Sequence, residues 1–388
     1  MTDKKKVMVV FGTRPEALKM VPLVKAFQRE ASFFETFVCV TAQHREMLDQ
    51  VLSLFDVSPH CDLDVMTANQ SLSGLTARLL PGLTQVMEKE LPDVVFVQGD
   101  TTTTFVAALA AFYLKIPVAH IEAGLRTADK YSPFPEEINR RITSVLADYH
   151  YPPTDVAAAN LIREGISEKV ICKTGNTVID ALKWVIEKQK DKLVKNRLES
   201  FFKTQFNISF SDKVRTVLVT GHRRENFGQG FDQICQAISD IAGNNENVQF
   251  VYPVHLNPNV QKPVYSILGD IDNVFLIPPL DYEPFSFLMK QCYLVMSDSG
   301  GIQEEAPFLG KPVLVLRNTT ERPEGIRAGT AKLVGTNAGK IRDEAEKLLN
   351  DKNAYRTMAQ AVSPYGDGLA GKRIVAHIKS VFTREGRK

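Results

Sequence analysis

The sequence predicts an α/β protein with two doubly wound, mostly parallel sheets. Short apolar runs rich in β-branched residues alternate with helical stretches along the chain. The runs are apolar throughout rather than at every second position, which is typical of parallel strands buried on both faces. With 388 residues the chain is also long for a single hydrophobic core, so two domains are expected.

The apolar runs fall into two groups, one before residue 155 and one after residue 215. The predicted strands are residues 7–11, 36–42, 94–99, 116–121 and 150–154, followed by 216–221, 248–254, 274–279, 293–298 and 312–317. The charged segment 187–205 between the groups is predicted to be surface helix near the domain junction. We therefore predict an N-terminal domain over 1–175 and a C-terminal domain over 176–364. The last helical segment, within 365–388, could close the second domain or cross back to the first.

The composition excludes several kinds of partner. The net charge is only +2, so the balance of charge indicates neither a nucleic-acid-binding nor a membrane-binding surface. The five cysteines are scattered without a CxxC pair, which fits a reduced, cytoplasmic protein and predicts no zinc or other metal site. The first apolar run is too short for a signal peptide, and no run has the length of a membrane helix.

Two acids follow two neighbouring strands of the first domain. Asp100 comes after the run 94–99, and Glu122 comes after the run 116–121. Ligands of open α/β sheets bind at the carboxyl ends of the strands, so both carboxylates are expected at one edge of the sheet. With two such domains, the natural site is a cleft between them.

A third acid begins the helix that follows. Glu136 and Glu137 lie in its predicted first turn, where acids usually only complement the helix dipole. Their closeness in sequence to Glu122 makes a role at the same sheet edge the alternative. The apolar face of this helix is predicted from Ile138 and Ile142, continuing to residues 146 and 149.

Arg14 is placed to bind an anion. It stands at a helix start directly after the first strand, with Pro15 at a favoured first position and Lys19 one turn on. A helix N-terminus with two cations can hold a phosphate. The alternative is a helix cap with surface cations.

A second anion site is predicted at Ser299, Gly300 and Gly301, where a strand runs into a helix. Paired glycines let backbone N–H groups approach a diphosphate closely. Glu304 and Glu305 follow, and either they only complement the helix dipole or one accepts the hydroxyls of a ribose. The chain contains neither GxGxxG nor a Walker P-loop, which argues against NAD, FAD and ATP.

His222 follows the first strand of the second domain and has Arg223 and Arg224 beside it. A histidine close to a diphosphate can be held protonated and can stabilise a leaving phosphate. The alternative is a capping histidine on a basic loop. His60, His150 and His377 have no such neighbours and are predicted to be structural.

These stretches together resemble the non-hydrolysing UDP-N-acetylglucosamine 2-epimerase family. The resemblance rests on an ordered set of motifs that runs from the first strand to the last turn: FGTRPEALKM, TAQHREMLDQ, QGDTTTTFVAALAAFY, HIEAGLRT, SPFPEEINRR, TGNTVIDAL, GHRREN, SDSGGIQEEAPFLGKPVLVLRNTTERPE and PYGDG. The set covers essentially the whole chain. SDSGGIQEEAP with TTERPE resembles the non-hydrolysing branch more than the hydrolysing one.

The resemblance implies two Rossmann-like domains in the GT-B arrangement, with the C-terminal helix crossing back to the first. It also implies a homodimer that interconverts UDP-GlcNAc and UDP-ManNAc without a redox cofactor, for bacterial surface polysaccharide synthesis. The catalytic residues that it implies are Asp100, Glu122, Glu136 and His222. The implied nucleotide contacts are Arg14, Lys19, Phe285, Ser299, Gly300, Gly301, Glu305 and Arg322.

The stretch Gln43, His44, Arg45 and Glu46 resembles part of a regulatory UDP-GlcNAc site, although bacterial members often have glutamine where this chain has Glu46. From the residues alone, it is either a solvated helix start or a secondary ligand site.

Epimerisation at C2 without a redox cofactor would proceed by loss of UDP to give 2-acetamidoglucal and re-addition of UDP. That route needs a base, an acid on the opposite face and a clamp for the diphosphate, which the three acids and the cationic loop could supply. A retaining GT-B glycosyltransferase is the alternative, and a non-catalytic UDP-sugar sensor is a third reading.

Overall fold

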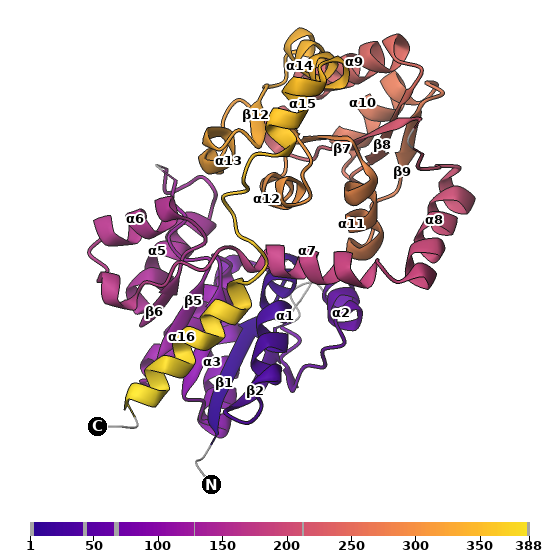
Figure 1. Ribbon diagram of the computed structural model, residues 1–388. Coiled ribbons are helices and arrows are strands. Elements are labelled where there is room, and N and C mark those ends of the chain that lie inside the picture. Colours follow the sequence, from indigo (N-terminus) through magenta and orange to yellow (C-terminus); the bar gives the residue numbers. More distant parts are fainter. Residues whose placement is uncertain (1–3, 42–44, 66–69, 128, 212, 386–388) are drawn as a thin grey trace. The chain divides into compact units, whose positions relative to one another are not determined.

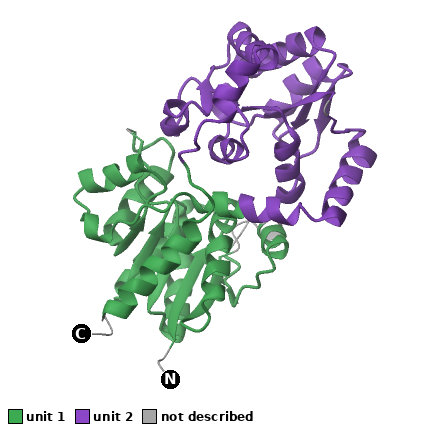
Figure 2. Cartoon of the chain, in the orientation of Figure 1, with its two compact units in different colours: residues 1–181, 365–388 green, residues 182–364 purple. Residues whose placement is uncertain are grey.

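The computed structural model describes residues 4–41, 45–65, 70–127, 129–211 and 213–385 (Figure 1). The chain divides into two compact units, residues 1–181 with 365–388 as unit 1 and residues 182–364 as unit 2 (Figure 2). The division falls inside helix α7 (Thr177–Lys188), whereas the sequence placed the domain boundary between 175 and 176. Each unit is a Rossmann-like layer structure, so the predicted fold class is confirmed. The cleft between the units stays a prediction.

Unit 1 is built on a parallel six-stranded sheet in the order β3-β2-β1-β4-β5-β6. Its strands are β1 (Lys5–Phe11), β2 (Phe34–Val40), β3 (Cys61–Asp62), β4 (Val94–Gln98), β5 (Val118–Ile121) and β6 (Tyr149–Tyr151). Its helices are α1 (Arg14–Arg29), α2 (Arg45–Leu54), α3 (Leu72–Glu90), α4 (Thr102–Tyr113), α5 (Glu136–Leu146), α6 (Asp155–Arg163), the start of α7, and α16 (Ala370–Glu385).

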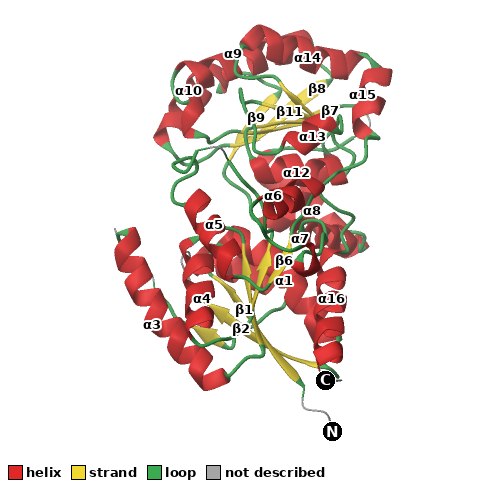
Figure 3. Ribbon diagram, turned by 90° about the vertical axis from the view of Figure 1, so that its left-hand side faces the viewer, coloured by secondary structure: helices red, strands yellow, loops and turns green. Residues whose placement is uncertain are grey.

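Helices cover both faces of this sheet (Figure 3). Val10, Val95 and Val97 pack against the apolar side chains of α3 and α4 on one face. Residues at alternate positions face the other way, where Phe96 meets Phe27 of α1 with ring centroids 5.0 Å apart. Burial on both faces explains why the strands read as continuous apolar runs.

Helix α16 belongs to unit 1 and packs against α1. The carboxylate of Asp180 accepts hydrogen bonds from the backbone N–H groups of Ala370 and Gly371, at 3.1 and 2.9 Å. An acid at a helix start compensates the orphan N–H groups and the positive end of the helix dipole. Lys379 of α16 also pairs with Glu30 at 2.7 Å.

Unit 2 repeats the architecture, with sheet order β12-β11-β10-β7-β8-β9. Its strands are β7 (Arg215–Thr220), β8 (Val248–Pro253), β9 (Val274–Ile277), β10 (Leu294–Ser297), β11 (Val313–Val315) and β12 (Ala331–Leu333). Its helices are the rest of α7, α8 (Lys192–Phe206), α9 (Gln229–Asn244), α10 (Pro258–Leu268), α11 (Tyr282–Gln291), α12 (Gly300–Phe308), α13 (Pro323–Arg327), α14 (Ala338–Asn350) and α15 (Lys352–Ala359).

The two faces of this second sheet form two separate cores. Val217 and Val219 of β7 pack with apolar residues of α9, α10 and α14. Leu218, between them, packs on the opposite face with residues of α8, α11 and α12. Numbered from its own first strand, each sheet has the Rossmann order 3-2-1-4-5-6, which places the topological switch point between β1 and β4 and between β7 and β10.

The structure differs from the sequence prediction in two respects. Strands β3 and β12, with two and three residues, were not predicted. Helix α5 departs from the predicted amphipathic helix, because Ile138 and Ile142 are exposed while Glu137 and Arg140 are buried. Leu146, from the same predicted face, does pack against the core. Over the parts of the chain that the structure describes, no helix is long and apolar enough to cross a membrane.

Candidate active site

The loop after β1 is held by the buried carboxylate of Glu16. Its Oε2 accepts from the backbone N–H groups of Gly12 and Thr13 at 3.1 and 2.8 Å, and its Oε1 accepts from the hydroxyls of Thr101 and Thr104 at 2.6 and 3.2 Å. Burial raises the pKa of Glu16, and these neutral donors offset only part of that effect. Glu16 thus ties the loop after β1 to the loop after β4.

Arg14 follows this loop at the first position of α1, after the N-cap residue Thr13. It is half-buried and makes no ion pair with any residue that the structure describes. An unpaired guanidinium at a helix N-terminus has the chemistry of an anion site.

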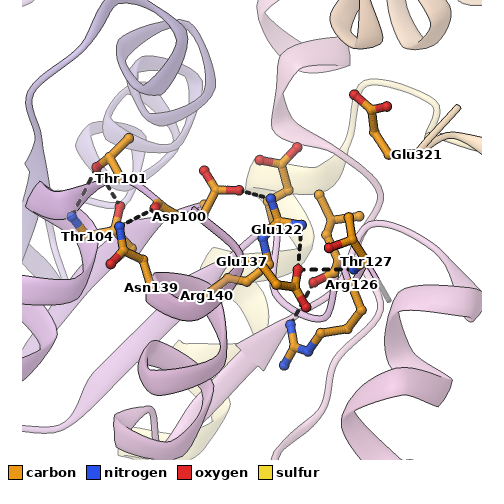
Figure 4. Close-up of polar contacts among 12 residues, drawn as sticks. Asp100, Thr101, Thr104, Glu122, Arg126, Thr127, Glu137, Asn139, Arg140 and Glu321 are labelled. Atoms are coloured by element: carbon orange, nitrogen blue, oxygen red, sulfur yellow. Dashed lines mark hydrogen bonds and ion pairs between the residues drawn. The ribbon is translucent and has the colours of Figure 1, made fainter. Parts of the chain in front are cut away.

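Asp100 follows β4 and is held by the first turns of α5. Its side chain forms an ion pair with Arg140, and its backbone carbonyl accepts from Nδ2 of Asn139 at 2.9 Å (Figure 4). About a quarter of the side chain is exposed, at 26%. Asp100 therefore lies at the sheet edge with its charge compensated.

Glu122 follows β5 and is almost wholly buried. Its Oε2 accepts from Lys19 at 2.6 Å and from Gln98 at 2.5 Å, and its Oε1 accepts from Asn176 at 2.8 Å. The backbone of Glu122 has φ of 59°, in the left-handed region that non-glycine residues seldom adopt. These donors from three different segments hold the residue in that conformation.

The two adjacent acids at the start of α5 have different environments. The side chain of Glu137 is fully buried and accepts from the backbone N–H of Thr127 at 3.0 Å (Figure 4). It also accepts from Arg141 at 2.8 Å. Glu136 is half-exposed and forms no ion pair within the described ranges of the chain. Glu137 is thus structural, and Glu136 is the one available to a ligand.

In unit 2, His222 stands at the end of β7 beside the buried Asp298 at the end of β10. Oδ2 of Asp298 accepts from the backbone N–H groups of His222 and Arg223 at 2.9 and 2.8 Å. Oδ1 lies 3.2 Å from Nδ1 of His222, close enough for an ion pair but without the angle of a hydrogen bond. Burial alone would raise the pKa of Asp298, but the contact with His222 and the backbone donors lower it below its ordinary value.

The turn of Ser299, Gly300 and Gly301 opens α12. Ser299 is the N-cap residue, but its side chain does not cap the helix. A Cβ at the exposed Gly301 would meet only a side-chain oxygen at 3.7 Å and another at 4.0 Å, so the backbone can be approached closely from outside. The backbone at Gly301, in the first turn of α12, is therefore accessible to an anion.

The other predicted nucleotide contacts of unit 2 are held by neighbours. Oε2 of Glu305 accepts from the hydroxyl of Tyr282 at 2.7 Å. Arg322 forms an ion pair with the buried Glu304, which fixes its guanidinium. Phe285 is half-buried against the core on the α8–α11–α12 face.

The predicted regulatory residues Gln43 and His44, together with the side chain of Glu46, lie outside the described part of the chain. Their role stays a prediction. Among the described residues, no group of three or more histidine, cysteine, aspartate or glutamate side chains could hold a metal ion.

Comparison with known proteins decides the family. A family model described as UDP-N-acetylglucosamine 2-epimerase matches residues 25–379. The UDP-N-acetylglucosamine 2-epimerase of Salmonella typhimurium is 56% identical over 97% of this chain and 98% of its own length. The chain belongs to the UDP-N-acetylglucosamine 2-epimerase family. The predicted resemblance is confirmed, and this is a family of isomerases.

Solved structures agree with this assignment to the epimerase family. A crystal structure of the UDP-GlcNAc 2-epimerase of Neisseria meningitidis, bound to UDP-GlcNAc, matches with a TM-score of 0.89 and 50% identity, over 97% of this chain and all of that one. A Methanocaldococcus jannaschii UDP-GlcNAc 2-epimerase, in complex with UDP-GlcNAc and UDP, matches with a TM-score of 0.79 and 33% identity, over 97% of this chain and 99% of that one.

Sequence reasoning missed the residues that hold this epimerase-family site in place. Gln98, Asn176 and Asp298 all lie inside motifs that the sequence analysis quoted, but they were assigned no role. Asp298 follows a strand, as Asp100 does, and this position at a strand end could have predicted a role in the site. Asn176 and Gln98 carry no such signal, because only the fold brings them to Glu122.

Two buried histidines of this epimerase-family chain predict sensitivity of unit 1 to acid. His120, a core residue of β5, has a pKa lowered by burial to about 3, and its strand neighbour His150 has a pKa lowered by burial to about 4. In the unfolded chain each histidine has a pKa of about 6.5, so below that pH the unfolded chain binds a proton at each one and the folded chain does not. The free energy of unfolding is therefore highest above about pH 6.5 and decreases as the pH falls toward the pKa values of the folded state.

His120→Gln should weaken this dependence while keeping a donor for the carbonyl of Gly99, which contacts Nε2 of His120 at 2.8 Å. Between pH 6 and 5, urea unfolding of the variant should lose about 1 kcal/mol less stability than the wild type. His60→Gln, at an exposed histidine whose Nδ1 accepts from the backbone N–H of Val38 at 3.0 Å, tests whether a histidine outside the core also contributes. Equal losses in His120→Gln and wild type would contradict the assignment.

Proposed function

We propose that this protein catalyses the reversible epimerisation of UDP-N-acetylglucosamine to UDP-N-acetylmannosamine at C2, without a redox cofactor. The observation that carries the proposal is the match over nearly the full chain to epimerases, one of which was crystallised with UDP-GlcNAc. The polar groups at the switch point of each sheet support it, because they supply acids in unit 1 and anion-binding groups in unit 2. In the cell, the cytoplasmic product would supply N-acetylmannosamine units for bacterial surface polysaccharides.

The chemistry requires a proton to leave and return at a carbon that is not acidic. A base removes the C2 proton while the bond from C1 to the phosphate oxygen breaks, and the electron pair of that bond leaves with UDP. The resulting 2-acetamidoglucal has a double bond between C1 and C2. An acid then protonates the opposite face of C2, and UDP adds back at C1.

In this proposal Asp100, Glu122 and Glu136 handle the protons. The first two are paired with Arg140 and Lys19, which keep a charged carboxylate tolerable at a partly buried sheet edge. Glu136 has no such partner in the described chain and is the acid most open to a proton from solvent or substrate.

The departing diphosphate is assigned to Arg14, His222 and the first turn of α12. His222 keeps Nε2 for the ligand, because its Nδ1 faces Asp298. Asp298 would thereby set which ring nitrogen of His222 faces a leaving phosphate. Glu305 and Arg322 are proposed to contact the rest of the nucleotide, with Phe285 beside them.

A homodimer is also proposed, and the exposed apolar side of helix α5 supports it. Ile138, Ile142 and Val145 lie three and four residues apart on its exposed side, and Val145 is 80% exposed. An apolar stripe over a polar buried face is typical of a helix that packs against a partner chain.

Light scattering should give about twice the chain mass of 43.3 kDa. Val145→Asp should shift the protein toward the monomer, because it buries a charge in the proposed interface. Val362→Asp, at a valine of unit 2 that is 83% exposed, should not. A monomeric wild type would refute the dimer.

The elimination route predicts isotope exchange at C2. Incubated with UDP-GlcNAc alone in deuterated water, the protein should give UDP-ManNAc that carries deuterium at C2, because the returning proton comes from an exchangeable acid. Proton NMR follows both the product and the label in one time course. Epimerisation with the original hydrogen retained would exclude this route.

The same experiment separates the alternatives. A retaining glycosyltransferase would leave UDP-GlcNAc unchanged until an acceptor was added, and would then transfer the sugar to it and release UDP. A sensor would bind the nucleotide sugar without converting it. Either outcome would overturn the proposed function.

Replacing the three acids should affect turnover far more than binding. Asp100→Asn, Glu122→Gln and Glu136→Gln are nearly isosteric but cannot exchange a proton, so each should lower the epimerisation rate by about 10²–10⁴-fold. Their affinity for UDP, measured by calorimetry, should change little. Arg14→Ala should show the opposite pattern and weaken UDP binding by about 1.5–3 kcal/mol, as for a lost charge-assisted contact.

Asp155→Asn is the matched control, because Asp155 is an exposed acid of the same unit, paired only with Lys173 at 2.7 Å among the contacts described. Its rate should equal that of the wild type. Thermal midpoints on all variants distinguish lost chemistry from lost stability. A variant that turns over within about threefold of the wild type removes that acid from the proton transfers.

A further inference from the structure

Two cysteines face each other across neighbouring strands of unit 1. Cys39 of β2 and Cys61 of β3 are register partners in this parallel pair. Hydrogen bonds on either side fix the register, from the backbone N–H of His60 to the carbonyl of Val38 at 2.8 Å and from that of Leu63 to Val40 at 2.9 Å. Neither thiol is held by a disulfide.

The two side chains lie on the same face of the sheet. Cys39 is part of the core that α3 and α4 cover, and Cys61 packs against that core. Neighbouring strands lie about 4.8 Å apart, and disulfides form at Cα separations of about 4.4–6.8 Å. A bond between the two sulfurs therefore needs no separation or slippage of the strands.

We propose that Cys39 and Cys61 form a two-thiol site that hydrogen peroxide oxidises reversibly to a disulfide. The proposal involves none of the acids of the candidate active site, and it does not depend on the proposed function. No other pair of the five cysteines is adjacent in a sheet, and all five lie in the described chain.

The two thiols differ in access and in reactivity. Cys61 lies on the edge strand β3 and is half-buried, whereas Cys39 is wholly buried. A hydrogen bond from Cys39, aided by Lys89, lowers the pKa of Cys61 to about 7. The same contact, together with burial, raises the pKa of Cys39 well above its ordinary value. Cys61 is therefore the attacking thiolate and Cys39 the resolving thiol.

The reaction balances in two steps. The Cys61 thiolate attacks one oxygen of the peroxide, the O–O bond breaks, and the other oxygen leaves as hydroxide and takes a proton. Cys61 is then a sulfenic acid. Cys39 loses its proton and attacks the Cys61 sulfur, the S–O bond breaks, and water leaves. Two thiols and one peroxide give one disulfide and two waters, and a dithiol reductant reverses the change.

The disulfide would fasten the edge of the sheet. Strand β3 has only two residues and pairs on one side alone, with β2. A covalent link at this position restricts the unfolded chain between residues 39 and 61, which carries α2. Oxidation should therefore raise the thermal midpoint of unfolding.

The test treats the full-length protein with hydrogen peroxide near pH 7, then alkylates the thiols after denaturation. The wild type should lose two alkylation sites, mapped by mass spectrometry to the peptides with Cys39 and Cys61, and should regain both with dithiothreitol. Cys61 should react about tenfold faster than the half-buried Cys172, whose pKa is raised by burial, because its larger thiolate fraction outweighs its lower intrinsic nucleophilicity.

Three variants make the result specific. Cys39→Ser should stop at the sulfenic acid of Cys61, which dimedone traps, and Cys61→Ser should leave Cys39 available to the alkylating reagent. Cys172→Ser should behave as the wild type. The proposal is overturned if the wild type reaches sulfinic acid at Cys61 while Cys39 stays free, or if Cys61 reacts no faster than Cys172.

Discussion

In each unit a buried carboxylate accepts two consecutive backbone N–H groups of the loop that follows the first strand. Glu16 does so for residues 12–13 in unit 1, and Asp298 does so for residues 222–223 in unit 2. A loop that turns from a buried strand toward a helix leaves such groups without ladder partners, and a buried orphan donor costs about 1–3 kcal/mol. The carboxylate removes that cost and fixes the direction in which the chain leaves the sheet. Arg14 and His222 therefore emerge at the switch point of their sheets with a defined orientation.

The two carboxylates nevertheless have opposite electrostatics. The partners of Glu16 are hydroxyl and N–H groups without charge, so burial prevails and its pKa is raised. Asp298 is also buried, but it faces the ring of His222, and its pKa is lowered. The first acid can thus serve as a neutral or charged tie between loops, whereas the second is a fixed negative charge beside an imidazole. Asp298 occupies the strand end equivalent to that of Asp100, which is paired with Arg140 instead. The two units thus carry an acid at the end of the equivalent strand, but its partner is Arg140 in unit 1 and His222 in unit 2.

The sequence allowed the two Rossmann-like sheets to be predicted because strands buried on both faces must be apolar throughout. It also located the polar groups, since strand ends are where a parallel sheet can carry them. Strands β3 and β12 could not be predicted, because a run of two or three residues is too short to show a pattern of apolar residues. The face of α5 was wrong because Ile138 and Ile142 fit a core stripe, whereas the fold buries Glu137 and Arg140 in an ion pair. The donors to Glu122 could not be predicted, because they converge from segments far apart in the chain.

The charged side chains of the candidate site differ in whether a neighbour of opposite charge lies beside them. The carboxylates of Asp100 and Glu122 and the guanidinium of Arg322 all have partners of opposite charge, which fix their positions before any ligand arrives. Arg14 and Glu136 have no such partner in the described chain, and each stands at the first position of a helix. The N-terminus of a helix repels a cation and attracts an anion, so Arg14 there is tolerable chiefly with an anion beside it, whereas Glu136 is already stabilised without one. Of these two residues, Arg14 therefore gives the stronger support to the proposed phosphate site, because the position of Glu136 needs no ligand to explain it.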